Sequence, residues 1–240
     1  MSWFPLFQGL FQNDDFKTLT PSAKLYSLFL ISEANLRGGA FFKSDLEIST
    51  ILAVSEKTIQ RGRKALGNRN LIEFESGFRD KRRKHLATRY LKVKWANVRE
   101  YKGDSYAQMD RYTFNTTLAW LREKRFQQTD ILVYVYLTYL RHWNNGNNEF
   151  FVTKRRLMEL AHLENPTERV NRLYNCYVSA DGNRLFEYVD YCHSFKFSEW
   201  AIIHNPENNE HNQKLEEHWR SEVKEIVERK RGLRQKAGGH

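Results

Sequence analysis

The chain has 240 residues, which is enough for two domains of ordinary size. Hydrophobic residues make up 40% of it and aromatic residues 14%, so packed cores are expected and disorder throughout the chain is excluded. Lys and Arg number 39 against 29 Asp and Glu, and the resulting net charge of +10 favours a polyanionic partner.

The sequence predicts a cytoplasmic protein without a membrane partner. No stretch approaches the ~20 apolar residues that crossing a bilayer requires. The start, MSWFPLFQGLFQNDDF, lacks the basic beginning and the small-residue cleavage site of a secretion signal. Two cysteines, Cys176 and Cys192, are too few for a disulfide scaffold, which fits a reducing compartment.

The first residues are dense in large apolar side chains, among them Trp3, Phe7 and Phe11. We expect them to pack as a strand or helix on the first domain, with an exposed partner-binding arm as the alternative. Thr20-Pro21 then provides a favoured N-cap and a favoured first position for a helix, which is predicted over residues 22–35.

A helix-turn-helix is predicted next. An apolar helix over residues 46–53 ends at Val54-Ser55, and a second helix opens on Ser55, whose side chain can accept a bond from a free backbone N–H group. Ile59, Gly62 and Leu66 share one face of this second helix. Lys57, Gln60, Arg61 and Lys64 share the opposite face. Together with Ser55 and Thr58, they are the candidate DNA-reading residues. Such a cationic, hydrogen-bonding face on a short helix suits the major groove.

A basic β-hairpin is predicted after this helix. One strand starts at Asn70-Leu71-Ile72 and another returns over residues 86–93, joined by a tip over residues 77–85. The candidate phosphate or minor-groove contacts are Arg79, Lys81, Arg82, Arg83 and Lys84, against the single acid Asp80. A hairpin needs no such charge to form, so the tip favours DNA binding over a solvated helix or a protein-contact module.

The order of elements repeats in the second half. A helix opens at Thr129-Asp130, the aromatic pair Phe150-Phe151 follows, and further helices are predicted over residues 154–162 and from Asn165-Pro166 to Tyr174. Two strands complete the repeat, over residues 185–189 and 191–197. We therefore predict an α+β, mainly helical fold of two tandem winged helix-turn-helix domains plus a C-terminal helix. The alternative is a helical second half unrelated to the first.

Composition sets the predicted boundaries. The first domain spans residues 1–96, a polar linker residues 97–111, the second domain residues 112–204 with a first helix over 115–124, and a charged tail residues 205–240. Within the tail, residues 205–213 are expected to be a loop and residues 214–233 a helix.

The second half is the weaker candidate for DNA binding, because its capped helix is nearly balanced in charge and its hairpin lacks a cationic tip. Its candidate contacts are Lys154, Arg155, Arg156, Arg169 and Arg172. This half could make a weaker groove contact or pair with another copy of the chain. The cations that end the tail helix could complement the helix dipole, extend phosphate binding, or accompany a dimerising helix.

Motifs of catalysis and cofactor binding are missing from the sequence. It contains no GxxxxGK[ST], GxGxxG, HExxH or paired CxxC pattern, so no enzyme, cofactor or metal site is expected. Cys176, Cys192, His193 and His162 are the nearest set of metal ligands, but their spacing is irregular.

The segment over residues 19–72 resembles the N-terminal winged-helix domain of phage and plasmid replication proteins, which include replisome organisers and DnaD-like primosome proteins. The LTPSAK opening, the FFKSD entry, and VSEKTIQRGRKAL followed by NLI carry the resemblance. Tandem winged helices also resemble plasmid initiators that bind repeated origin sequences. The chain departs from these families in lacking a DnaD-type C-terminal module and in having its more basic wing in the first domain.

The resemblance implies origin recognition and recruitment of a helicase or primase. We therefore expect a sequence-specific double-stranded DNA-binding protein that initiates replication of a plasmid, phage or mobile element, with a homodimer through the second domain or the tail helix as one possible assembly. The alternatives are a transcriptional or partition regulator on the same scaffold, and a winged-helix adaptor that binds protein.

Overall fold

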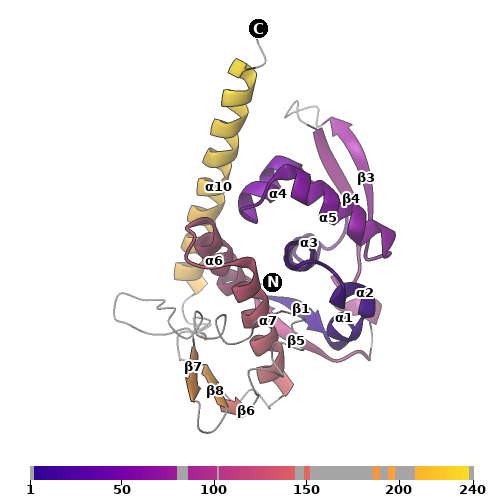
Figure 1. The fold of residues 1–240 in the computed structure, drawn as a ribbon, viewed down its shortest axis with the longest axis vertical. Coiled ribbons are helices and arrows are strands. Elements are labelled where there is room, and N and C mark those ends of the chain that lie inside the picture. The colour runs from indigo at the N-terminus through magenta and orange to yellow at the C-terminus, as the bar shows by residue number, and fades with distance from the viewer. Residues whose placement is uncertain are drawn as a thin grey trace.

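The structure, a computed structural model, describes residues 3–79, 86–101, 103–143, 149–151, 186–189, 194–197 and 209–237. The fold is α+β and mainly helical, with small antiparallel sheets (Figure 1). None of the described helices has the length and apolar character needed to cross a bilayer.

The apolar N-terminal segment packs into the body of the molecule. It forms strand β1 (Trp3–Phe7) and the short helices α1 (Gln8–Gln12) and α2 (Asp14–Lys17). Phe4, Leu6 and Leu10 are fully buried. The expectation of packing is confirmed, and the exposed arm is not found.

Strand β5 (Tyr106–Asp110) corrects the prediction of a linker over residues 97–111. It follows the 3-10 helix η1 (Val98–Tyr101) and pairs antiparallel with β1, so that Phe4 lies opposite Met109. Ala107 and Met109 are buried. Polar neighbours mask this short alternation in the sequence, and its apolar face is completed only by a strand about a hundred residues away. The remaining domain boundaries stay a prediction.

Helix α6 (Arg111–Arg122) starts four residues before its predicted beginning at residue 115. The carboxylate of Asp110 explains the early start, because it accepts the backbone N–H groups of Tyr112 at 3.2 Å and Thr113 at 3.3 Å. Asp is a favoured N-cap residue, and here the cap coincides with the end of a strand.

The helix predicted over residues 22–35 is present as helix α3 (Pro21–Arg37), and the Thr20 side chain caps it. Strand β2 (Phe41–Lys43), helices α4 (Asp45–Ile51) and α5 (Glu56–Asn68), and strands β3 (Ile72–Arg79) and β4 (Leu86–Val93) follow. The three strands form one antiparallel sheet in the order β2-β4-β3.

The second half has a sheet of the same order. Helix α7 (Gln128–Trp143) precedes strands β6 (Glu149–Phe151), β7 (Phe186–Val189) and β8 (Ser194–Phe197), which are ordered β6-β8-β7. The registers also correspond. Tyr90 lies opposite Phe41 and Phe74 in the first sheet, and Phe195 lies opposite Phe150 and Tyr188 in the second. This shared row of aromatic residues supports the duplication, although the helices predicted over 154–162 and 165–174 lie outside the described residues.

Corresponding elements of the two halves contact each other. The strand that opens the first half, β1, pairs with the strand that opens the second, β5. Helix α3 packs on helix α7, and near their starts the Ser22 hydroxyl donates to the Gln128 side-chain oxygen at 2.5 Å. An approximate two-fold axis between the halves would produce this arrangement.

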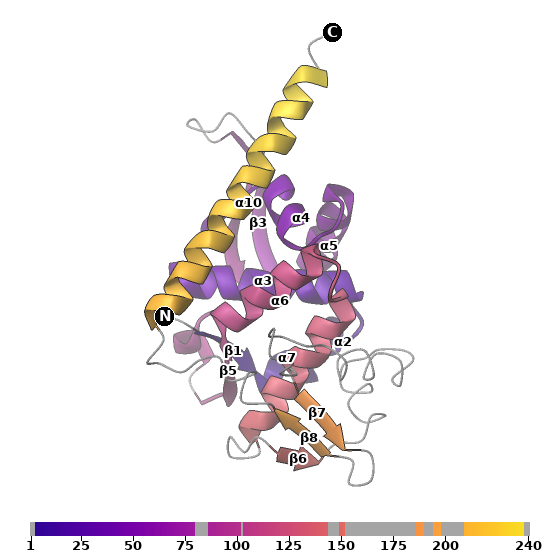
Figure 2. The same cartoon turned by 90° about the vertical axis from the view of Figure 1, so that its left-hand side faces the viewer.

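Helix α10 (Asn209–Ala237) lies against α4 and α6 (Figures 1 and 2). Val223 and Val227 are buried there, in the same hydrophobic cluster that begins at Phe4. The loop predicted over residues 205–213 is wrong for residues 209–213, which belong to the helix. Extending an existing helix by one residue is easier than starting one, so polar residues without an apolar period can join it.

Candidate nucleic-acid interface

The turn between α4 and α5 is fixed by backbone bonds and by one cap. The N–H of Val54 donates to the carbonyl of Ser49 at 3.0 Å, and the N–H of Ala53 donates to that of Thr50 at 3.4 Å. With Ala53 at φ +51°, these bonds form a Schellman motif that ends α4. Ser55 then caps α5 by accepting the N–H of Thr58 at 3.1 Å, as predicted. These bonds set the angle between the two helices.

The inner face of α5 packs on α3. Ile59 and Leu66 are buried, and Gly62 lies so close to the ring of Tyr26 that an added Cβ would be 3.1 Å from it. A larger residue at position 62 would push the two helices apart. The face that the sequence assigned to the interior is therefore the interior face.

Arg63 occupies this inner face as well, and it was not among the residues predicted for the site. Its guanidinium binds both carboxylate oxygens of Asp45 at the start of α4, with one N···O distance of 3.1 Å, and donates to the Thr88 hydroxyl in β4 at 2.7 Å. The hydroxyl groups of Tyr26 and Tyr90 bond to each other beside it. Arg63 lies four residues after Ile59, within the apolar stripe, and that position is the signal that could have revealed it.

The electrostatics of this network keep the arginine charged. Burial disfavours the charged guanidinium, but the hydrogen bond and negative charge of Asp45 outweigh it and raise the pKa of Arg63. Burial, followed by the neighbouring Tyr90, raises the pKa of Tyr26 well above its usual value. The network is thus a fixed ionic link that joins α5 to α4 and to the hairpin strand β4.

The outer face of α5 presents the predicted DNA-reading residues. Lys57, Gln60, Arg61 and Lys64 are exposed, Ser55 is exposed at the cap, and Thr58 is partly buried. Within the described part of the chain, no ion pair joins an acidic side chain to Lys57, Arg61 or Lys64. Lys57 and Arg61 are four residues apart, and like charges at that spacing destabilise a helix by a few tenths of a kcal/mol. This face is therefore suited to an anionic partner.

The hairpin stands beside α5 and extends from the body (Figure 1). Its register shifts between Glu73 and Phe74 and again between Glu75 and Phe78. Gly77, at φ +90°, lies within the second irregularity, where a side chain would be strained. The tip predicted over residues 77–85 is wrong for residues 77–79, which belong to β3. Arg79 ends this strand opposite Leu86, so one predicted cation lies at the base of the tip.

The other predicted site residues lie outside the described residues. In the hairpin tip these are Lys81, Arg82, Arg83 and Lys84, and in the second half they are Lys154, Arg155, Arg156, Arg169 and Arg172. The cysteine and histidine set of the second half also lies there. Their roles stay predictions.

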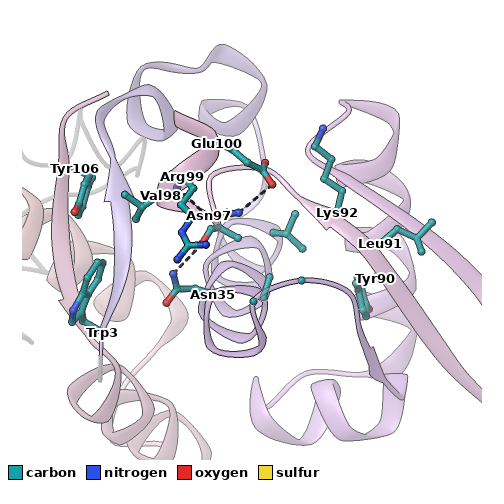
Figure 3. Close-up of a pocket in the computed structure, with 15 residues that line it drawn as sticks. Trp3, Asn35, Tyr90, Leu91, Lys92, Asn97, Val98, Arg99, Glu100 and Tyr106 are labelled. Atoms are coloured by element: carbon teal, nitrogen blue, oxygen red, sulfur yellow. Dashed lines mark hydrogen bonds between the residues drawn. The ribbon is translucent and has the colours of Figure 1, made fainter. Parts of the chain in front are cut away.

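A cavity of about 560 Å³ lies away from α5, between strands β1 and β5, the end of α3, β4 and η1 (Figure 3). The side chains of Asn35 and Asn97, which line the cavity, are engaged within the protein. The Asn35 amide donates to the carbonyl of Ala96 at 3.0 Å, and the Asn97 side chain accepts the N–H of Arg99 at 3.0 Å. Because these groups already have partners, the cavity is a weaker candidate site than the outer face of α5.

Comparison of the chain with protein-family models, with curated proteins and with solved structures finds no match.

Proposed function

We propose that this chain is a non-enzymatic, sequence-specific double-stranded DNA-binding protein whose first half is a winged helix. The order α3-β2-α4-α5-β3-β4, with sheet order β2-β4-β3, supports this assignment, because a winged helix has the same succession of helices and strands. The matching β6-β8-β7 order supports a second module of the same kind.

The observation that carries the proposal is the contrast between the two faces of α5. The inner face is locked by Gly62 against Tyr26 and by Arg63 against Asp45, so the rotation of the helix about its axis is fixed. The outer face displays Lys57, Gln60, Arg61 and Lys64 without an acidic partner among the described residues. A helix held rigidly with amide and cationic groups outward can read base edges in the major groove, and arginine is the commonest reader of guanine.

The resemblance of residues 19–72 to phage and plasmid replication proteins supports a role in replication initiation. In that role the chain binds origin DNA of a plasmid, phage or mobile element and recruits helicase or primase machinery. The position of the bound sequence, at an origin or at a promoter, separates this role from that of a transcriptional or partition regulator.

The proposal is tested by selecting duplexes from a random pool with the full chain, and then measuring the affinity of variants for the selected duplex and for a random one. We expect Arg61→Ala to weaken binding to the selected duplex by ~1–3 kcal/mol and random DNA much less, because a base contact is lost. We expect Arg82→Ala to weaken both duplexes by the same factor, because a hairpin-tip cation contacts phosphates, which carry no sequence information directly.

Arg99→Ala is the matched control, since this exposed arginine belongs to η1 beside the cavity and not to α5 or the hairpin. It should leave both affinities nearly unchanged. If wild-type chain selects no sequence, or if Arg61→Ala and Arg82→Ala lower both affinities equally, α5 is not the reading helix.

A further inference from the structure

The charges of α10 are separated along its length. Residues 209–228 contain six acidic residues and three basic ones. The following segment, RKRGLRQKA, contains Arg229, Lys230, Arg231, Arg234 and Lys236 and no acid. We call residues 229–236 the α10 arm.

The helix dipole does not explain why so many basic residues lie in the arm. Cations at a helix C-terminus are favoured, but the effect falls off within the last turn. Arg234 and Lys236 lie in the last turn of α10, whereas Arg229, Lys230 and Arg231 lie one to two turns before it. The earlier cations need another explanation.

Ion pairs with acidic neighbours do not explain these basic residues either. The arm lies beside α4, where Lys230 donates to the Thr50 hydroxyl at 3.3 Å and Arg231 approaches the Ser44 hydroxyl at 3.5 Å. The carboxylates nearby on α4 already have partners, since Asp45 binds Arg63 and Glu47 binds Lys43. Among the described residues no acidic side chain forms an ion pair with Arg229, Lys230 or Arg231.

The arm projects from the same end of the molecule as the hairpin. Both views show α10 and the β3-β4 hairpin extending past α4, and Figure 1 shows them on either side of α4 and α5. Val223 and Val227 anchor the helix in the core, while Leu233 is 63% exposed. The six residues after Arg231 extend the axis by a further ~9 Å at 1.5 Å per residue.

We propose that the α10 arm binds the phosphate backbone of the duplex that α5 reads, on the side of α5 away from the hairpin. The inference rests on the proposed function, because it adds a second phosphate contact to DNA held by α5. The arm exposes too little apolar surface to be a dimerising helix. Its one exposed leucine, Leu233, offers far less area than the ~800 Å² that each partner buries in a stable interface. Self-association through two such arms would also bring like charges together.

The test compares two triple variants of the full chain that remove the same charge from the same helix. The arm variant is Arg229→Gln, Arg234→Gln and Lys236→Gln, which spares the two residues that contact α4. The control variant is Lys214→Gln, Arg220→Gln and Lys224→Gln, in the part of α10 that is rich in acids. Affinity for the selected and the random duplex is measured against salt, and hydroxyl-radical footprints on the selected duplex are recorded.

We expect the arm variant to bind both duplexes roughly tenfold more weakly at moderate salt, and its slope of log affinity against log salt to be shallower by ~2–3. Its footprint should lose protected sugars on one flank of the site only. The control variant should keep the wild-type slope and footprint. Thermal melting of both variants checks that the fold is retained.

The outcomes separate this inference from the proposed function. If Arg61→Ala loses sequence preference as expected but the arm variant retains the wild-type slope and footprint, the arm inference alone is wrong. If wild type binds neither duplex, the proposed function fails and the arm inference fails with it. If the free wild-type protein sediments as a dimer and the arm variant sediments as a monomer, α10 is a dimerising helix and the inference is overturned.

Discussion

Arg63 shows how one buried charged residue can orient a surface that it does not belong to. Its guanidinium connects α5 to Asp45 in α4 and to Thr88 in β4. With Arg63 held on the inner face of α5, Gln60, Arg61 and Lys64 lie on the exposed face. Removing one partner of a buried ion pair leaves the other charge unsatisfied, which is why such pairs tolerate substitution poorly. Arg63 is therefore a positioning residue for the candidate interface.

Lys24 is a second buried cation, and burial disfavours its charged form. It is 1% exposed in α3, and burial lowers its pKa from 10.5 to about 8. Between these two values the folded chain binds fewer protons than the unfolded chain, so the free energy of unfolding rises with pH through this window. Below about pH 8 the buried charge opposes folding.

We predict that Lys24→Met raises the free energy of unfolding at pH 7 by about 1–3 kcal/mol, and that the gain shrinks as the pH approaches 9.5. Urea denaturation at a series of pH values measures it. Lys57→Met, at an exposed position of α5, serves as the control and should show no such trend. A gain from Lys24→Met that stays constant from pH 7 to 9.5 would contradict the assignment.

The ends of the helices determine how the candidate interface is oriented. Helices α4, α5 and α6 each end with a non-glycine residue of positive φ: Ala53, Asn70 and Lys124. In each case the two bonds of a Schellman motif are present. Asparagine tolerates this conformation better than alanine or lysine does, so the end of α4 carries a conformational cost.

We predict that Ala53→Gly raises the free energy of unfolding by about 0.5–1 kcal/mol. Glycine removes the left-handed penalty of ~1–2 kcal/mol but loses part of the gain through its greater freedom in the unfolded chain. The urea midpoint should rise while the slope m stays constant.

Ala65→Gly provides the opposite control, because position 65 lies inside α5, where glycine costs about 1 kcal/mol. DNA affinity should survive Ala53→Gly, since the turn keeps its shape. A lower midpoint for Ala53→Gly would show that the turn is not strained.

At the scale of the molecule, the two halves share one hydrophobic cluster from β1 to α10. The β1·β5 pair joins the first strand to a strand from the middle of the sequence, and α3 packs on α7. A body with one core unfolds as a unit more readily than two bodies joined by a linker.

We predict that α3 and α7 lose their backbone protection together as denaturant is added. Hydrogen exchange followed by mass spectrometry, in increasing urea, monitors peptides from both helices in one sample. Deleting residues 1–7 should lower the protection of β5, which loses its only partner strand in the described sheets. Protection of α7 at urea concentrations that already expose α3 would contradict a shared core.

Local sequence signals predicted much of the first half. Caps at Thr20 and Ser55, the apolar stripe of α5 and the bounds of β4 depend on neighbours within a few residues, and they appear in the structure as expected. The outward placement of Lys57, Gln60, Arg61 and Lys64 follows from the same helical period. Their contact with DNA remains a prediction.

Features that depend on partners far away in the chain could not be predicted from the sequence. Strand β5 has an apolar alternation too short to distinguish from a polar linker until β1 supplies its partner. The ion pair between Arg63 and Asp45 likewise needs two helices to meet at the angle set by Ala53 and Ser55. The position of the α10 arm beside α4 was undetermined, because the charge of a helix says nothing about which surface it lies on.

The sequence by itself determined which residues form helices and strands through most of the first half, and which face of α5 is polar, because helical periodicity and capping act over one or two turns. Tertiary structure alone decided that residues 106–110 complete a sheet with β1, that Arg63 is a buried link and that α10 lies beside α4. Each of these depends on burying a surface against a chain segment far away in sequence, and the free energy for that comes from the assembled core.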